Sequence, residues 1–209
     1  YTLGDGNVIG MTNDHGIFVQ DAEGTEIIDN SIGYKPGSYE DRGAGQDGSG
    51  SGIRIEGDIG ATDTVLSANT IGYSNGDGVE LVADGSVWIQ SGDIGIGSGG
   101  QDIGNSGNGI YGNDMSLQLI VGNDMDTTYD PLKKVVIGNN DQNGVLINNA
   151  EHCEFATVDI GLYNGDTAAG NGMNGMNLSC GPSTGTDILI GGIDDAGERV
   201  VIGANDNHG

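Results

Sequence analysis

The sequence contains few of the residues that favour helices, collagen or nucleic-acid binding. Its 209 residues include 3 Pro, 2 Phe, 1 Trp, 2 Cys and 6 Lys plus Arg. Collagen is excluded because Pro is nearly absent and the 42 Gly follow no strict third-residue period. No apolar run approaches the roughly 18 residues that span a bilayer, so we expect no membrane span.

The charge is strongly acidic, because 31 Asp plus Glu oppose the few basic residues and give a formal net charge of −25. Such a field repels nucleic-acid phosphates and anionic membranes, so we expect no nucleic-acid partner. It suits a milieu rich in salt or calcium, where cations screen or bind the carboxylates.

The abundant residues are turn formers. Gly, Asn and Asp are frequent and Ile and Val recur at regular places, a composition typical of short strands joined by many tight turns. The regular apolar positions also argue against a disordered chain.

Three segments of equal length align without gaps. They are "IGMTNDHGIFVQDAEGTEIIDNSIG" (9–33), "IGYSNGDGVELVADGSVWIQSGDIG" (71–95) and "IGNNDQNGVLINNAEHCEFATVDIG" (137–161), and "IGANDNHG" (202–209) begins a further copy. Equivalent positions are apolar and alternate with polar ones, as for Val19, Leu81 and Ile147. Each copy therefore predicts three short strands with period-two patterning.

Looser copies lie between these segments and carry the same Gly-Ile and Ile-Gly marks. The marks define double repeats over 9–70, 71–136 and 137–201, with the start of a further coil at 202–209. Short repeats of this kind bury their apolar face only by stacking on their neighbours. We expect one segment, 1–209, of an all-β fold: a right-handed parallel β-helix solenoid of about six coils, with Ile32, Ile94 and Ile160 stacked inward.

The segments "NSIGYKPGSYEDRGAGQDGSGSGIRI" and "NTIGYSNGDGVEL" carry a resemblance to a known family. They resemble the right-handed parallel β-helix repeats, pectin-lyase-like in fold, of large bacterial and archaeal surface proteins. The resemblance implies an extracellular or cell-surface location. Proteins with this fold also include polysaccharide lyases, glycoside hydrolases, tailspikes and adhesins, so the resemblance specifies the fold and not one activity.

Both ends of the chain lie within the repeat pattern. The sequence opens inside a coil at "NVIG" (7–10) and closes at Gly209, the Gly that precedes the next strand. We therefore expect a solenoid truncated at both ends, which continues into further repeats of a larger protein.

The histidines and cysteines fall in repeat columns. His15 and His208 share a turn column with Ser51, Asp77, Asn108, Asn143 and Asn174, which predicts a turn role. Cys153 shares an inward column with Thr25 and Val87, which predicts a buried thiol. A bridge between Cys153 and Cys180 remains open, since the two lie about one coil apart.

An enzymatic role also remains open. "IDDAG" (193–197) and "NHG" (207–209) resemble the paired-Asp and Gly-His-Gly motifs of polygalacturonases, with Asp194 and Asp195 as the pair. The pattern departs from that family at Asn207, and no Arg-Ile-Lys follows. We assign no catalytic residue.

One acidic loop has the spacing of a metal site. In "GNDMDTTYDP" (122–131) alternate residues carry oxygen ligands, which predicts a Ca²⁺ site formed by Asp124, Asp126, Thr128 and Asp130. The alternative is a solvated acidic loop. Calcium is the only cofactor that the sequence indicates.

Aromatic residues suggest a further surface. A sugar-stacking platform on an outer face is a hypothesis for Tyr34, Tyr39, Tyr73, Tyr111, Tyr129 and Trp88. Taken together, the sequence predicts a structural or adhesive segment of a larger extracellular protein, acidic and calcium-binding, whose partners are polysaccharides or cell-surface components. The alternative is a module that binds or cleaves polysaccharide, or a viral tailspike.

Overall fold

A computed structural model of the chain describes residues 2–3, 6–45, 48–114, 116–122, 134–179, 187–191 and 199–208. Within these residues the regular elements are β-strands, and none is a helix. The strands form two large parallel sheets, here called sheet A and sheet B, and two short antiparallel hairpins. The prediction of an all-β fold with parallel strands is therefore confirmed.

Sheet A carries 11 of the 22 described strands. It comprises β1 (Thr2–Leu3), β3 (Ile17–Gln20), β4 (Glu26–Ile28), β8 (Ile53–Ser67), β10 (Val79–Ile89), β12 (Ile110–Asn113), β13 (Leu117–Gly122), β15 (Val145–Asn149), β16 (His152–Ala156), β20 (Met176–Leu178) and β21 (Asp187–Ile190). Sheet B comprises β2 (Val8–Ile9), β5 (Ser31–Ile32), β9 (Asn69–Ile71), β11 (Gly92–Ile94), β14 (Val135–Ile137), β17 (Val158–Ile160) and β22 (Val200–Ile202).

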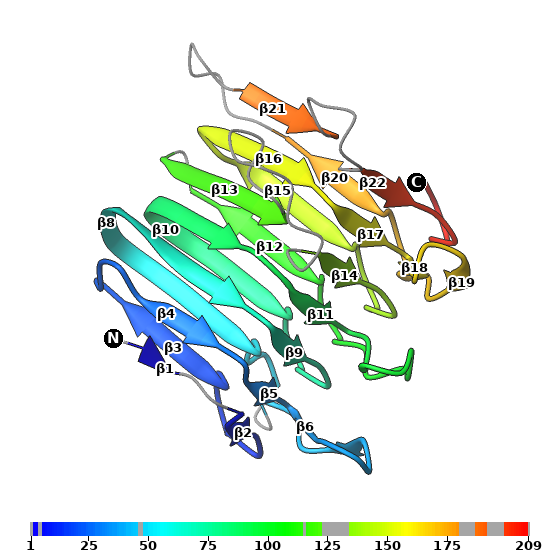
Figure 1. The fold of residues 1–209 in the computed structure, drawn as a ribbon. Helices are drawn as coiled ribbons and strands as arrows, with labels where there is room; N and C mark the ends of the chain where they lie inside the picture. Colours follow the sequence, from blue (N-terminus) through cyan, green and yellow to red (C-terminus); the bar gives the residue numbers. More distant parts are fainter. Residues whose placement is uncertain are drawn as a thin grey trace.

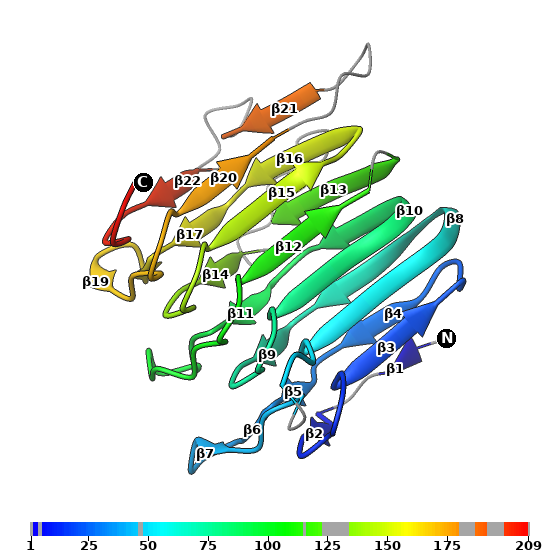
Figure 2. The same ribbon diagram turned by 180° about the vertical axis from the view of Figure 1, so that it is seen from behind.

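The chain passes through sheet A, then through sheet B, and returns to sheet A beside the strand it has just formed. We call one such passage a circuit. Circuits run over 17–32, 53–71, 79–94, 110–137, 145–160 and 176–202. Figures 1 and 2 show them stacked in chain order, from blue at one end to red at the other.

Sheet A contains two columns of strands. The first column holds β3, β12, β15 and β20, and the second holds β1, β4, β13, β16 and β21. In the second and third circuits the two columns join, since β8 and β10 each run through both and appear as long curled arrows in Figure 1. The prediction of three separate strands in every copy is wrong for 79–94, where a register shift beside Gly85 replaces the expected break.

Sheet B presents one uninterrupted column of isoleucines to the interior. The strand registers place the same position of every circuit in line: Ile9, Ile32, Ile71, Ile94, Ile137, Ile160 and Ile202. The five central members are at most 2% exposed. The predicted stacking of Ile32, Ile94 and Ile160 two strands apart is confirmed, and each buried side chain contributes roughly 1.5–3 kcal/mol of hydrophobic stabilisation.

The first column of sheet A follows the same rule. Val19 pairs with Ile55, which pairs with Leu81, and the line continues through Gly112 to Ile147. Val19 is 8% exposed, and Leu81 and Ile147 are fully buried. Alternate residues of these strands therefore point inward, as the period-two pattern predicts.

Asparagine side chains form ladders between circuits at the turns. Asn105 Nδ2 donates to Asn140 Oδ1 at 2.8 Å, and Asn140 Nδ2 donates to Asn171 Oδ1 at 2.9 Å. Asn171 in turn donates to Asn205 Oδ1 at 2.9 Å. The three donors are at most 1% exposed, so each ladder satisfies amide groups that would be costly to bury without a partner.

The turn that follows sheet B alternates between two conformations. After β5, β11 and β17 the residue with positive φ is glycine: Gly33, Gly95 and Gly161. After β2, β9, β14 and β22 the residue with positive φ is the second one after the strand and is not glycine: Met11, Tyr73, Asn139 and Ala204. The glycine turns lead into protruding segments, here called excursions: the hairpin of β6 (Tyr34–Lys35) and β7 (Glu40–Asp41), residues 96–102, and the hairpin of β18 (Leu162–Tyr163) and β19 (Thr167–Ala168).

Candidate functional site

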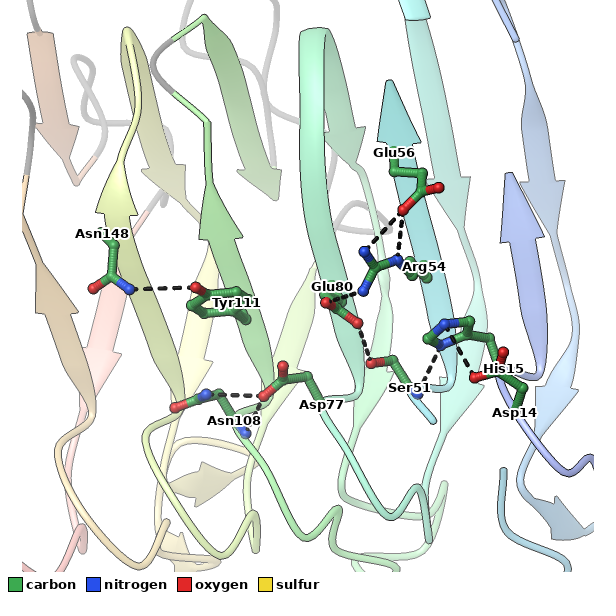
Figure 3. A network of polar contacts seen from close by, with 10 residues as sticks. All are labelled: Asp14, His15, Ser51, Arg54, Glu56, Asp77, Glu80, Asn108, Tyr111 and Asn148. Carbon is green, nitrogen blue, oxygen red and sulfur yellow. Dashed lines mark hydrogen bonds and ion pairs between the residues drawn. The ribbon is translucent and has the colours of Figure 1, made fainter. Parts of the chain in front are cut away.

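The outer face of the first column of sheet A carries a polar network that joins side chains of successive circuits (Figure 3). Strand register places Phe18, Arg54, Glu80, Tyr111 and Leu146 in one outward line. These residues alternate with the buried ones, so their side chains reach solvent or one another. Along this line, outward side chains of successive circuits lie next to one another.

Arg54 joins two glutamates. Its Nε and Nη2 atoms lie 2.9 and 2.8 Å from Glu56 Oε2, and its Nη1 contacts Glu80 Oε1 on the next circuit. Burial lowers the pKa of Arg54, but the hydrogen bonds and charges of Glu56 and Glu80 outweigh it, so the pKa is raised above its usual range. The cluster carries two negative charges against one positive charge.

The network continues toward the preceding circuit through Ser51 and His15. Ser51 Oγ donates to Glu80 Oε2 at 2.7 Å, and the Ser51 backbone N–H donates to His15 Nδ1 at 3.0 Å. His15 Nε2 lies 3.2 Å from Asp14 Oδ1. A Ser-His-Asp set therefore occurs here, but its bonding differs from that of a hydrolase, because the serine hydroxyl is bound to Glu80 and not to the imidazole.

The two glutamates are also arranged unlike a hydrolytic pair. A glycosidase needs one protonated carboxyl to donate to the leaving oxygen and a second carboxylate facing the sugar. Here a single guanidinium binds both carboxylates. The network links strands of neighbouring circuits, and we identify no proton donor within it.

Tyrosines gather at a second place, around the excursions. Tyr34 and Tyr39 stack with ring centroids 5.8 Å apart, and Tyr73 donates its hydroxyl to the backbone of Tyr39 at 3.2 Å. Tyr39 lies 3.2 Å from Ser98 Oγ, and Tyr163 donates to the Ser98 carbonyl at 2.6 Å. Ser98 thus connects excursions that lie 59 and 65 residues away in the chain.

The predicted aromatic platform is therefore only partly assembled. Tyr34, Tyr39 and Tyr73 meet, but Tyr34 is 5% exposed and its ring is covered by Tyr39. Trp88 lies elsewhere, on the second column of sheet A, with its indole N–H donating to the Gly122 carbonyl at 2.8 Å. Tyr129 lies outside the described residues.

The predicted calcium ligands Asp124, Asp126, Thr128 and Asp130 lie outside the described residues, as do Asp194 and Asp195. The calcium site therefore stays a prediction. Among the residues that the structure describes, no group of three or more His, Cys, Asp or Glu side chains is placed to hold a metal ion.

The predicted column of Cys153 is confirmed. It pairs with Leu119, which pairs with Val87, and it is 1% exposed. Cys180 lies outside the described residues, so the proposed bridge stays open. The described residues form no helix that could cross a bilayer.

The turn column of His15 is confirmed and extended. Asn108 Nδ2 donates to Asp77 Oδ1 at 2.8 Å, and Asn143 and Asn174 continue the line at 2.9 and 2.8 Å. The column can be recognised in the sequence, but these hydrogen bonds between its members are seen only in the structure. The Arg54 cluster was not predicted from the sequence, although Arg54 and Glu80 occupy the same repeat position, two residues after the glycine that precedes the strand.

Comparisons of the chain with protein-family models, with curated proteins and with solved structures found no match.

Proposed function

We propose that the chain forms a right-handed parallel β-helix that serves as a rigid, acidic structural or adhesive segment of a larger extracellular or cell-surface protein. The observation that carries the proposal is the isoleucine line of sheet B, which continues without a break from Ile9 to Ile202. Parallel strands joined by crossovers are almost always right-handed, which supports the proposed hand.

The polar groups support a structural role in the same way. The Asn ladders, the Arg54 cluster and the tyrosines of the excursions each bond across circuits. These donors and acceptors bond to neighbouring circuits of the same chain. A rod stiffened along its length by such contacts suits a stalk, a sheath or an adhesive surface.

The acidic surface supports a location outside the cell. A net charge of −25 is tolerated best where salt or divalent cations are plentiful. Antibodies raised against the chain should label intact source cells without permeabilisation. Labelling only after permeabilisation would contradict the proposed location.

The alternative is a module that binds or cleaves polysaccharide. It is favoured by one observation, the outward line in which strand register places Phe18 and Tyr111 on either side of Arg54 and Glu80. Figure 3 shows Arg54, Glu80 and Tyr111 of this line. Phe18 is 50% exposed and could contact a sugar ring.

A depolymerisation assay separates the two functions. The chain is incubated with acidic and neutral polysaccharides, and reducing or unsaturated ends are measured. We expect no release. Release that is lost in both Arg54→Gln and Glu80→Gln, and retained in the surface variant Lys35→Gln, would replace the structural proposal with the alternative.

A further inference from the structure

A second charged cluster lies on the outer face of sheet B, far along the chain from the Arg54 network. Register places Asp93, Val136 and Asp159 in one outward line on β11, β14 and β17. Lys134 immediately precedes β14 and extends its side chain to Asp159, with Nζ 2.5 Å from Oδ2. The lysine therefore lies on the circuit between two aspartates.

The contact between Lys134 and Asp159 is close and sheltered. The Asp159 side chain is 2% exposed and that of Lys134 is 32% exposed. Oδ2 is buried and accepts no hydrogen bond of ordinary geometry among the described residues, although Nζ lies beside it. The amine is thus held against the carboxyl group without the alignment of a normal charged hydrogen bond.

A small apolar cluster lies on the same face of sheet B as the pair. Val136 stands between the two aspartates, and it forms a buried cluster with Ile96 and Ala169, against which Tyr163 packs. Ile96 and Tyr163 come from excursions that follow sheet B, and the Asp159 side chain on this face is 2% exposed. A setting that excludes water favours condensation over hydrolysis.

Asp93 supplies a third group, two strands from Asp159 in the same outward line, with Lys134 on the circuit between them. Burial raises its pKa to about 6, while the charge of Lys134 opposes the shift. Such a carboxyl can accept and return a proton near neutral pH.

We propose that Lys134 and Asp159 form an intramolecular isopeptide bond, with Asp93 as the proton relay. The bond joins Lys134 Nζ to Asp159 Cγ, and the bond from Cγ to Oδ2 breaks. Two of the three ammonium protons pass to that oxygen, which leaves as one water molecule. Asp93 accepts and returns protons and is unchanged, and no oxidant or cofactor is consumed.

The fold supplies what this reaction needs. Condensation of free amines with carboxylates is unfavourable in water, but fixing both groups in one geometry raises their effective concentration to about 10⁵ M or more. Here β14 and β17 are held in register on both sides of Asp159, by Val135 with Val158 and by Ile137 with Ile160, and Lys134 directly precedes the first of these pairings. The resulting cross-link would tie adjacent circuits covalently, independently of the proposed role at the cell surface.

Intact-mass spectrometry of the purified 209-residue chain tests the proposal. The folded protein should weigh one water, about 18 Da, less than its sequence predicts. Proteolysis should yield a branched peptide that joins the segments containing Lys134 and Asp159. A folded chain with the full sequence mass would overturn the proposal.

The variants separate this bond from other losses of water. Lys134→Arg keeps the charge but removes the amine, so the full mass should return, while Lys35→Arg at the exposed pair with Glu40 should leave the loss in place. Asp93→Asn should slow formation at least about tenfold, as expected for loss of a proton-transfer group. Retention of the loss in Lys134→Arg, or its mapping to an Asp-Gly pair such as Asp77-Gly78, would contradict the inference.

Discussion

At the scale of single residues, the asparagine ladders impose a requirement that hydrophobic burial alone does not. Asn140 accepts from Asn105 and donates to Asn171, and it also accepts from the Asn105 backbone. Removal of its side chain would take the Oδ1 acceptor from the Asn105 backbone N–H and from Asn105 Nδ2, while Asn171 Oδ1 would still accept from the Asn140 backbone N–H. Buried groups that lose partners in this way cost about 1–3 kcal/mol each.

We therefore expect Asn140→Ala to lower the free energy of unfolding by about 2–4 kcal/mol. Urea unfolding followed by circular dichroism measures the effect. The matched control is Asn148→Ala, since Asn148 is exposed and its Nδ2 donates to the Tyr111 hydroxyl at 3.4 Å. This substitution should change stability by less than about 0.5 kcal/mol. Equal effects of the two substitutions would show that the ladder adds nothing.

Asp77 occupies the end of a ladder whose other members are asparagines. Burial raises its pKa, although the N–H groups of Asn108 oppose the shift by donating to Oδ1. A carboxyl whose pKa is raised on folding destabilises the protein once pH exceeds its ordinary value, because the unfolded chain then loses its proton more readily. The penalty is absent at pH values below the unfolded pKa.

Asp77→Asn should therefore stabilise the chain at pH 7 and have little effect at about pH 3, below the usual pKa of an aspartate. The amide retains the Oδ1 acceptor that Asn108 uses. Urea unfolding at the two pH values checks the sign. A stabilisation that is the same at both values, or larger in acid, would contradict the assigned cause.

At the scale of elements, the turns after sheet B determine which circuits carry excursions. Gly95 has φ +79, and a Cβ at this position would lie 2.0 Å from the Gly138 carbonyl oxygen of the next circuit. Gly37 has φ +84, but nothing lies within 4 Å of its Cβ position. Both glycines have positive φ, but only the Cβ position of Gly95 would collide with the backbone of a neighbouring circuit.

Gly95→Ala should consequently destabilise far more than Gly37→Ala. For Gly37→Ala we expect about 1 kcal/mol, the cost of a left-handed alanine. For Gly95→Ala we expect at least 3 kcal/mol, because the backbone of two circuits must separate. Thermal and urea unfolding of both variants provide the comparison, and similar losses would mean that the turns are not tightly stacked.

Much of the element arrangement can be predicted from the sequence, because inward residues must match those above and below. The shared column of Ile32, Ile94 and Ile160 can be recognised because the residue type is the same in each repeat. The column of Cys153 can be recognised from its place in the aligned repeats. The continuity of β10 was not predicted, since a bulge at Gly85 has no distinct sequence pattern. Contacts such as that of Arg54 with Glu80 depend on outward side chains, whose columns vary from circuit to circuit.

At the scale of the whole molecule, charge dominates. A net charge of −25 along stacked circuits places many carboxylates within a Debye length of one another at low salt. Screening or binding of cations relieves the repulsion, so the melting temperature should rise with salt. A melting temperature that falls or stays constant between low and moderate NaCl would contradict this expectation.

Calcium should add to the salt effect if the predicted ligands Asp124, Asp126, Thr128 and Asp130 form a site. Millimolar Ca²⁺ should then raise the melting temperature more than Mg²⁺ at equal ionic strength, because Mg²⁺ sheds its waters reluctantly. Asp126→Asn should remove the excess and leave the general salt effect. Equal shifts of the melting temperature with both ions in the unmutated chain would mean that the segment is a solvated acidic loop.

The alternation of turns after sheet B also bears on how such a gene can lengthen. Glycine turns with excursions follow β5, β11 and β17, and the turns between them lack excursions. Excursions two strands apart already contact each other, through Ser98 with Tyr39 and with Tyr163. Duplication of a single circuit would place two excursions on adjacent strands, about 4.8 Å apart, at half that spacing. Recombination that copies an even number of circuits preserves the spacing, so the heritable unit of this architecture is a pair.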